Sequence, residues 1–167
     1  IALMPDETRL FISDSTSRTV VVIDTLTNEI ITRIPVANSP SELKISKDGK
    51  RVYVLQQFNN LMTIIDANTY AVLKRIDFPC CMHAQNDFEF SFDERYIYVA
   101  SFDSNFVLVY DLQEDKVVKV IDTGLDPLIV ASTPDKHYLY VSEVTGDKIS
   151  VIDTLTNNLV RTIELGK

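Results

Sequence analysis

An internal repeat constrains this chain more than any other feature of its sequence. The heptapeptide Val-Ile-Asp-Thr-Leu-Thr-Asn occupies residues 22–28 and recurs unchanged at residues 151–157, with degenerate copies at 64–69 and 109–112. Three series of residues share the same steps of 42, 45 and 42 along the chain. They are Asp24, Asp66, Asp111 and Asp153; Asp6, Asp48, Asp93 and Asp135; and Phe11, Tyr53, Tyr98 and Tyr140. Self-similarity at such a period indicates a repeat protein in which each copy is one supersecondary unit.

Each copy contains four short apolar runs separated by polar turns. The run at 51–55 is β-branched and aromatic, as strands prefer, and the turn at 47–50 contains the Asp and Gly that tight turns favour. Sixteen such runs without helical periodicity predict an all-β fold. Four antiparallel strands per repeat of this length are typical of a β-propeller blade. We predict a single β-propeller domain or fragment, with blades at about 1–34, 42–76, 87–121 and 127–163.

Two of the copies share a pair of motifs. Arg-Val-Tyr-Val at 51–54 is followed by Met-Thr-Ile-Ile-Asp at 62–66, and Tyr-Leu-Tyr-Val at 138–141 by Ile-Ser-Val-Ile-Asp-Thr at 149–154. These motifs resemble the YVTN-type β-propeller repeat, and the resemblance covers the whole chain. The turn at 46–50, Ser-Lys-Asp-Gly-Lys, is similar to the Ser-Pro-Asp-Gly-Lys turn of that family, from which 4–7 and 92–95 depart. The resemblance implies a propeller of surface-layer, secreted or periplasmic binding proteins, or one attached to a redox enzyme.

Four blades are few for a closed ring. Seven or eight blades of this size need about 300–340 residues, and Ile1 already falls within a β-like run. We therefore expect a mature product or a part of a longer propeller. Two chains pairing into an eight-bladed ring, and four blades that close or stand open alone, are the alternatives. Open end blades would expose apolar faces, which favours the first two arrangements.

The charge balance narrows the class of partner. Against 16 Lys and Arg the chain has 24 Asp and Glu, a formal net charge of −8. Nucleic acid requires a basic surface, so nucleic acid is not an expected partner. No apolar run approaches the roughly 20 residues of a membrane span. We expect a protein or glycan partner.

Strand direction sorts the polar residues between the two ends of each blade. Because neighbouring strands are antiparallel, the first-to-second and third-to-fourth turns share one end, here named the turn end, and the remaining loops share the other, the rim end. The aspartates of the repeat fall at the turn end, where we interpret them as turn formers. Polar residues also close every second strand at the rim end, where loops on a rigid scaffold often bind partners. The predicted binding rim, for which an ordinary solvated surface is the alternative, consists of Asp14, Gln56, Gln57, Asn59, Ser101, Asp103, Asn105 and Glu143.

The loop between the second and third copies is the largest irregularity. It contains Cys80, Cys81, Met82 and His83, which include both cysteines of the chain. Three interpretations are open. Adjacent cysteines can form a strained vicinal disulfide, since their Cα atoms lie about 3.8 Å apart, below the usual 4.4–6.8 Å. Thiolate, thioether and imidazole are also soft ligands for copper, zinc or iron, with a partner completing the site. The third interpretation is two small buried thiols.

Two functions follow from these observations. The favoured one is a non-catalytic binding or scaffold propeller, secreted, periplasmic or at the cell surface, that uses the rim to hold its partner. The alternative is a propeller of a redox or metalloenzyme system in which the loop with Cys80, Cys81 and His83 lies near a metal, haem or quinone. We predict no catalytic residue, and no cofactor other than a metal or haem reached through a partner. Cys81 and His83 are too close in sequence to provide an activated thiolate with its orienting group.

Overall fold

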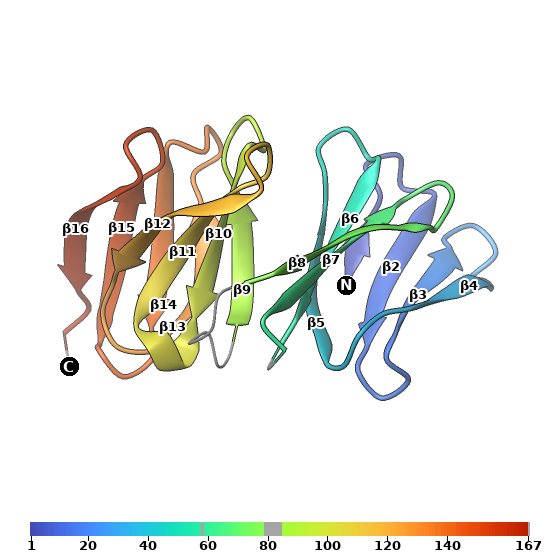
Figure 1. Cartoon of the computed structure of the whole chain (residues 1–167), viewed down its shortest axis with the longest axis horizontal. Helices are drawn as coiled ribbons and strands as arrows, with labels where there is room; N and C mark the ends of the chain where they lie inside the picture. Colours follow the sequence, from blue (N-terminus) through green and yellow to red (C-terminus); the bar gives the residue numbers. More distant parts are fainter. Residues whose placement is uncertain (58, 79–84, 167) are drawn as a thin grey trace. The chain divides into compact units, whose positions relative to one another are not determined.

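The chain is built from β-strands arranged in four sheets. The computed structural model describes residues 1–57, 59–78 and 85–166, with the backbone alone at Gln85 and Asn86. The described part contains strands and one short 3-10 turn, η1 (Phe102–Ser104). The chain divides into two compact units, Ile1–Pro79 (unit 1) and Cys80–Lys167 (unit 2), each with two four-stranded antiparallel sheets (Figure 1).

Unit 1 contains the sheets β1-β2-β3-β4 and β5-β6-β7-β8, in which every strand pairs with the next along the chain. The strands are β1 (Ala2–Leu3), β2 (Arg9–Asp14), β3 (Thr19–Asp24), β4 (Ile30–Pro35), β5 (Pro40–Ile45), β6 (Arg51–Gln56), β7 (Leu61–Asp66) and β8 (Val72–Asp77). The first strand of the second sheet, β5, packs against β1 and β2 of the first sheet.

Unit 2 repeats this plan with the sheets β9-β10-β11-β12 and β13-β14-β15-β16. Its strands are β9 (Gln85–Phe90), β10 (Tyr96–Ser101), β11 (Phe106–Asp111), β12 (Lys116–Asp122), β13 (Pro127–Ser132), β14 (Tyr138–Glu143), β15 (Lys148–Asp153) and β16 (Asn158–Glu164). Here β13 packs against β9 and β10. The predicted all-β fold of four-stranded antiparallel blades is confirmed.

Burial distinguishes the inner strands of a blade from its outer strand. Five of the six residues of β6 are buried, as are the first five of β7, because both faces of these strands are covered. Such strands carry near-continuous apolar runs. The fourth strands β8 and β12 alternate between exposed and less exposed side chains over most of their length. The period of two shows that one face of each outer strand meets solvent.

The repeated aspartates form the turns that the sequence predicts. In the third-to-fourth turn of the first sheet, one carboxylate oxygen of Asp24 accepts the backbone N–H groups of Leu26 and Thr27, both at 2.9 Å. Asp66, Asp111 and Asp153 accept the same pair of N–H groups in the other three sheets. Because these hydrogen bonds favour the ionised carboxylate, the pKa of Asp24 lies below its ordinary value.

The two units have equivalent apolar cores. The core of unit 1 contains Phe11, Val20, Val22, Ile34, Leu43, Val52, Val54 and Ile65. A shift of 87 residues maps these onto Tyr98, Val107, Val109, Ile121, Val130, Leu139, Val141 and Ile152, which form the core of unit 2. Each core gathers side chains from both sheets of its unit, so the repeat specifies the packing between sheets as well as the strands.

Candidate functional site

The ends of the second strands hold the most unusual polar groups of the described chain. Gln56, Ser101 and Glu143 terminate β6, β10 and β14, and their exposures are 0%, 0% and 6%. Each has one buried polar atom without a hydrogen-bond partner: Nε2 of Gln56, Oγ of Ser101 and Oε2 of Glu143. Among the described residues, these are the only buried side-chain atoms of this kind.

An unpartnered buried polar group has an energetic cost. Its desolvation destabilises a fold by about 1–3 kcal/mol, and most native proteins avoid it. That three such groups occur at equivalent positions of three sheets points to a common reason. Each such group in a native protein requires an explanation, and an ion, a water molecule or a ligand contact is among the recognised ones.

In unit 2, Glu143 is enclosed by two loops. Its Oε1 accepts the Gly124 N–H at 3.0 Å and the Ser150 hydroxyl at 2.6 Å. A Cβ at Gly124 would lie 1.6 Å from Oε2, and one at Gly146 would lie 2.7 Å from the same atom. Two of the chain's four glycines therefore make room for this carboxylate.

The loops around Glu143 are tied to one another. The side-chain oxygen of Asn105 accepts the Asp126 N–H at 3.1 Å, and the Asp126 carboxylate accepts the Thr145 hydroxyl at 2.7 Å. These bonds join the loop after β10 to the loops that precede β13 and follow β14. The rim end of unit 2 is therefore an ordered surface with a buried carboxylate beneath it.

In unit 1 the same position holds a carboxamide. Gln56 corresponds to Glu143 by the shift of 87 residues, and its Oε1 accepts the Thr63 hydroxyl at 3.2 Å, as Glu143 accepts that of Ser150. Beside it, the Asn59 amide donates to the carbonyl of Asn38 at 2.7 Å. Sequence reasoning missed Thr63 and Ser150, although their offset of seven residues from Gln56 and Glu143 is a shared signal.

The remaining predicted rim residues differ from this buried set. Asp14 turns back on its own loop, where it accepts the backbone N–H of Thr16 and of Ser17, both at 3.1 Å, and the Ser17 hydroxyl at 2.7 Å. These bonds, with that hydroxyl first, lower the pKa of Asp14. Gln57 is half-buried, and Asp103 is exposed in the 3-10 turn η1.

Side chains that could bind a metal are scattered over the described part of the chain. Across 1–57, 59–78 and 85–166, no three His, Cys, Asp or Glu side chains lie close enough together to hold an ion. The predicted loop with Cys80, Cys81 and His83 lies outside the described residues, so it stays a prediction. Within the same ranges, no helix has the length and hydropathy needed to span a membrane.

Comparison with known proteins supplies the family. A model of the cytochrome D1 heme domain matches residues 51–166, more than half of the chain. The chain belongs to the cytochrome D1 heme domain family. The propeller superfamily implied by the repeat fits this family, and the matches do not name the YVTN type.

Two curated relatives match over more of the chain than the family model does. The chain is 28% identical over 130 residues to dihydro-heme d1 dehydrogenase of Pseudomonas aeruginosa, a match that covers 77% of this chain and 26% of that protein. It is also 28% identical over 178 residues to antigen Lp49 of Leptospira interrogans, covering 94% of this chain and 38% of the relative. The chain therefore spans well under half of the length of either relative.

Solved structures establish the fold as a β-propeller. The chain superposes on the hydrazine synthase of Kuenenia stuttgartiensis with a TM-score of 0.85 at 23% identity, covering 96% of this chain and 47% of that one. A second match is a putative 6-phosphogluconolactonase from Bacteroides fragilis, with a TM-score of 0.81 at 17% identity, covering 98% and 52%. Because both identities are low, these likenesses carry the fold alone.

Proposed function

We propose that this chain is the propeller part of a haem-associated protein and binds its partner or cofactor at the rim without catalytic residues of its own. One observation carries the proposal: the unpartnered buried atoms of Gln56, Ser101 and Glu143 all belong to the predicted rim. The family match and the name of the Pseudomonas relative support the association with haem.

The described rim does not fit the iron of a haem. Haem iron is held by imidazole, thioether, thiolate or phenolate groups, whereas the rim supplies carboxylates, carboxamides and a hydroxyl. Of the chain's two histidines, His137 is the one described, and it follows the turn end of β13. Met62, near the rim end of β7, is fully buried. We therefore infer that the rim contacts polar groups at the edge of a ligand. The iron would be held by residues outside the described part.

Two further predictions belong to this proposal. Units 1 and 2 are consecutive parts of one propeller domain, completed by further blades or by a second chain, which agrees with the larger size of the matched proteins. The protein works in the periplasm, at the cell surface or outside the cell, as the repeat resemblance implies and the family supports.

Nuclear magnetic resonance of the full chain with ferric haem tests the rim directly. Ferric iron is paramagnetic and broadens the amide signals of residues near it, while zinc protoporphyrin provides a diamagnetic control. In unit 2 we expect broadening at 101–105 and 143–147, at its rim end, and sharp signals at 93–95 and 135–137, at its turn end. Broadening confined to the second group, or absent from the spectrum, would overturn the proposal.

A variant at Ser101 separates binding from folding. Ser101→Ala removes a hydroxyl without a partner, so the chain should fold at least as well while the haem-dependent broadening falls several-fold. Thr27→Ala, in an exposed turn at the other end of unit 1, is the matched control and should bind as the unaltered chain does. Equal broadening in both variants would remove the rim from the site.

The same titration tests the loop with Cys80, Cys81 and His83. If this loop supplies an iron ligand, the shift in the haem absorption band seen with the unaltered chain is lost in His83→Gln or in the double variant Cys80→Ser, Cys81→Ser. Identical spectra in all three proteins would exclude that role. Neither result changes the interpretation of the broadening experiment, because that experiment measures residues of the rim and not of this loop.

A further inference from the structure

Unit 2 has a cleft at its turn end, away from the rim. The cleft lies between the sheets β9–β12 and β13–β16 and encloses about 390 Å³, within the range of small-ligand sites. Its walls come from the first-to-second turns of both sheets and from the third-to-fourth turn of the second sheet. The residues that decide its chemistry are Phe92, Asp93, Tyr96, Asp135, His137 and Leu155.

Large apolar side chains stand open to solvent at the mouth of the cleft. Phe92 is 64% exposed and Leu155 is 75% exposed, although both sit in short turns that a polar residue would suit. Phe92 follows Ser91 at the point where the second sheet of unit 1 has Lys47. Both apolar side chains line the cleft, so a partner bound there would cover them.

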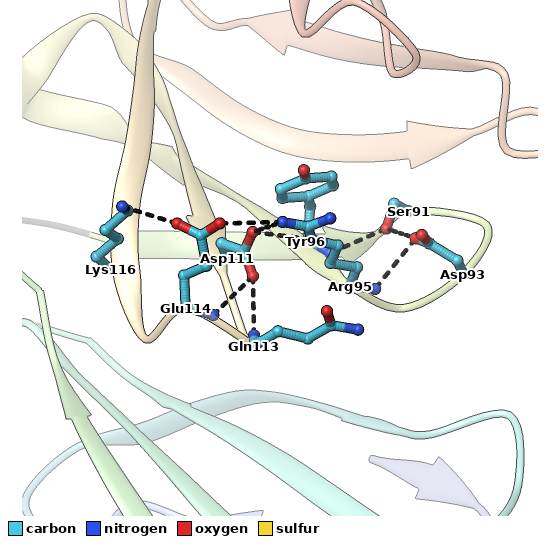
Figure 2. Close-up of polar contacts among 8 residues, drawn as sticks. All are labelled: Ser91, Asp93, Arg95, Tyr96, Asp111, Gln113, Glu114 and Lys116. Atoms are coloured by element: carbon cyan, nitrogen blue, oxygen red, sulfur yellow. Dashed lines mark hydrogen bonds and ion pairs between the residues drawn. The ribbon is translucent and has the colours of Figure 1, made fainter.

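A network of polar contacts holds Tyr96, one wall of the cleft, in place (Figure 2). The backbone N–H of Tyr96 donates to the Ser91 hydroxyl at 3.0 Å, and that hydroxyl donates to Asp93 at 2.6 Å. The Arg95 guanidinium lies 5.1 Å from the Tyr96 ring centre and pairs with the nearly unexposed Asp111 at 2.7 Å. The wall is therefore preformed, and its ring already contacts one guanidinium.

Unit 1 shows what the equivalent space accommodates. The shift of 87 residues maps Tyr96 onto Arg9, and in unit 1 the Arg9 guanidinium fills the space between the two sheets. It donates to the carbonyl of Ala67 at 2.6 Å and to the Asn68 side chain at 3.1 Å, and lies 6.0 Å from the Tyr70 ring centre.

Met4, Pro5 and Gly49 lie close together at the same end of unit 1. Met4 is 4% exposed, and a Cβ at Gly49 would meet Met4 Cε and Pro5 Cδ at 3.5 Å. In unit 2 these three positions are Ser91, Phe92 and Lys136, and the space is open.

The charge around the cleft of unit 2 suits a cation. Asp93 and Asp135 line it, and hydrogen bonds from the hydroxyls of Ser91 and Thr133 come first among the causes that lower the pKa values of these two carboxyls. Lys136 is already paired with Glu89 at 3.0 Å, and Arg95 with Asp111 and Glu114. His137 lies 3.9 Å from the carboxylate of Asp153. Carboxylates therefore outnumber the cations beside the cleft.

From these observations we propose that the cleft of unit 2 binds an arginine side chain from a partner protein, in the place that Arg9 takes in unit 1. The guanidinium meets Asp93 and Asp135 and shares the Thr154 carbonyl, which corresponds to that of Ala67. This carbonyl accepts the Tyr98 hydroxyl at 3.2 Å and has a second lone pair. The aliphatic stem of the arginine packs between Phe92 and Leu155.

Capped tripeptides added to the full chain test the ligand chemistry. The probes are Gly-Arg-Gly, its neutral citrulline analogue of the same shape, and Gly-Glu-Gly, each followed by amide chemical shifts. We expect the arginine peptide to shift the signals of residues 92–96, 135–137 and 154–155 with at least tenfold higher affinity than citrulline. Equal affinity for citrulline, or preference for the glutamate peptide, would overturn the proposal.

Filling the cleft from within tests its location. Tyr96→Arg places in unit 2 the arginine that fills the equivalent space of unit 1. It should abolish the shifts caused by the arginine peptide. Tyr140→Arg makes the same change of charge on β14 outside the cleft lining, and should leave binding unchanged. Leu155→Ala, at a 75% exposed position, removes the apolar side chain against which the arginine stem packs, and weakens binding several-fold without burdening the fold. Undiminished binding in both Tyr96→Arg and Leu155→Ala would contradict the assignment.

Discussion

In unit 1 the two sheets are tied at the turn end by Arg9, whereas in unit 2 the tie is the hydroxyl of Tyr98. This hydroxyl donates to the Thr154 carbonyl at 3.2 Å and to the Asn157 side chain at 2.5 Å. Phe11, the counterpart of Tyr98, lies 6.5 Å from the Tyr70 ring in unit 1 and has no hydroxyl. Equivalent apolar cores are therefore joined at the turn end by different hydrogen bonds, from a guanidinium in unit 1 and from a phenol hydroxyl in unit 2.

These two sets of hydrogen bonds leave different surfaces at the turn ends of the two units. A guanidinium reaches across the gap between the sheets and fills it, while a phenol bonds deeper in the interface and leaves the space above it open. Burial raises the pKa of Tyr98, so its hydroxyl stays protonated and donates across the physiological pH range. The two units therefore share the packed interface between their sheets. They differ in the polar side chain that bonds across it at the turn end, and an open surface arises where that side chain differs.

The largest expected effect is on the shared core. Phe11→Ala and Tyr98→Ala each remove a fully buried ring between two sheets, and should lower the free energy of unfolding by about 3–5 kcal/mol. Tyr98→Phe removes the hydroxyl alone and should cost about 1 kcal/mol. Urea denaturation measures all three. A nearly neutral Tyr98→Ala, beside a costly Phe11→Ala, would break the equivalence of the two interfaces.

A smaller effect is expected from the tie of unit 1. Arg9→Tyr installs the residue that unit 2 has at this position, and loses the part-buried hydrogen bond to the Ala67 carbonyl. Hydrogen bonds of charged groups contribute about 1.5–3 kcal/mol, so the free energy of unfolding should fall by that amount. Arg161→Tyr, on the exposed strand β16, is the matched control. Equal urea midpoints for the two variants would show that Arg9 does not hold the sheets together.

Most of the fold could be predicted from the sequence because the repeat consists of local signals, which are apolar runs and turn-forming aspartates. The runs at 19–24, 61–66, 106–111 and 148–153, which the sequence predicts as third strands, match β3, β7, β11 and β15 residue for residue, since each ends at the aspartate that forms its turn. First strands were harder: β1 is reduced to Ala2–Leu3, and β5 begins at Pro40, two residues before the predicted start. Irregular register between Pro40 and Leu43 explains this difference, because a bulge shifts a strand's start without a turn signal.

The candidate sites could be predicted only in part. The position of Gln56, Ser101 and Glu143 at strand ends followed from topology, but their burial did not, because it depends on loops such as the one containing Gly124. The cleft was missed altogether. Its signal in the sequence was the replacement of Arg9 by Tyr96 and of Pro5 by Phe92 in a repeat that otherwise keeps its turn aspartates. Such departures gain meaning only once the space between the sheets is known.

A smaller effect of opposite sign is expected at the rim. Ser101→Ala removes a buried hydroxyl without a partner and should raise the free energy of unfolding by about 1 kcal/mol. Its counterpart in unit 1, Asp14→Ala, removes an acceptor of three hydrogen bonds and should lower it. Thermal denaturation of the two variants gives the sign. Destabilisation by Ser101→Ala would mean that this hydroxyl supports the fold, and the rim would lose one of its three markers.

The smallest effects concern the turn carboxylates Asp24 and Asp111, which the shift of 87 residues makes equivalent. Both have a pKa below the ordinary 3.8, chiefly through the Thr27 N–H for Asp24 and through Arg95 for Asp111. A pKa lowered by folding stabilises the protein above the ordinary value, and this stability is lost as pH falls through the lowered value.

Asparagine variants should therefore separate the two turns at pH 7 and converge below about pH 3.8. Asp24→Asn keeps an oxygen that accepts the Leu26 and Thr27 N–H groups, so its urea midpoint should change little. Asp111→Asn loses the charge that faces Arg95 at 2.7 Å, so its midpoint at pH 7 should fall further. At pH 3 the difference between the variants should shrink, because the Asp111 carboxyl that Asp24→Asn retains begins to protonate. A gap that persists unchanged at pH 2 would assign the difference to turn geometry instead of to the Arg95 ion pair, and would weaken the argument that Arg95 fixes the Tyr96 wall of the cleft.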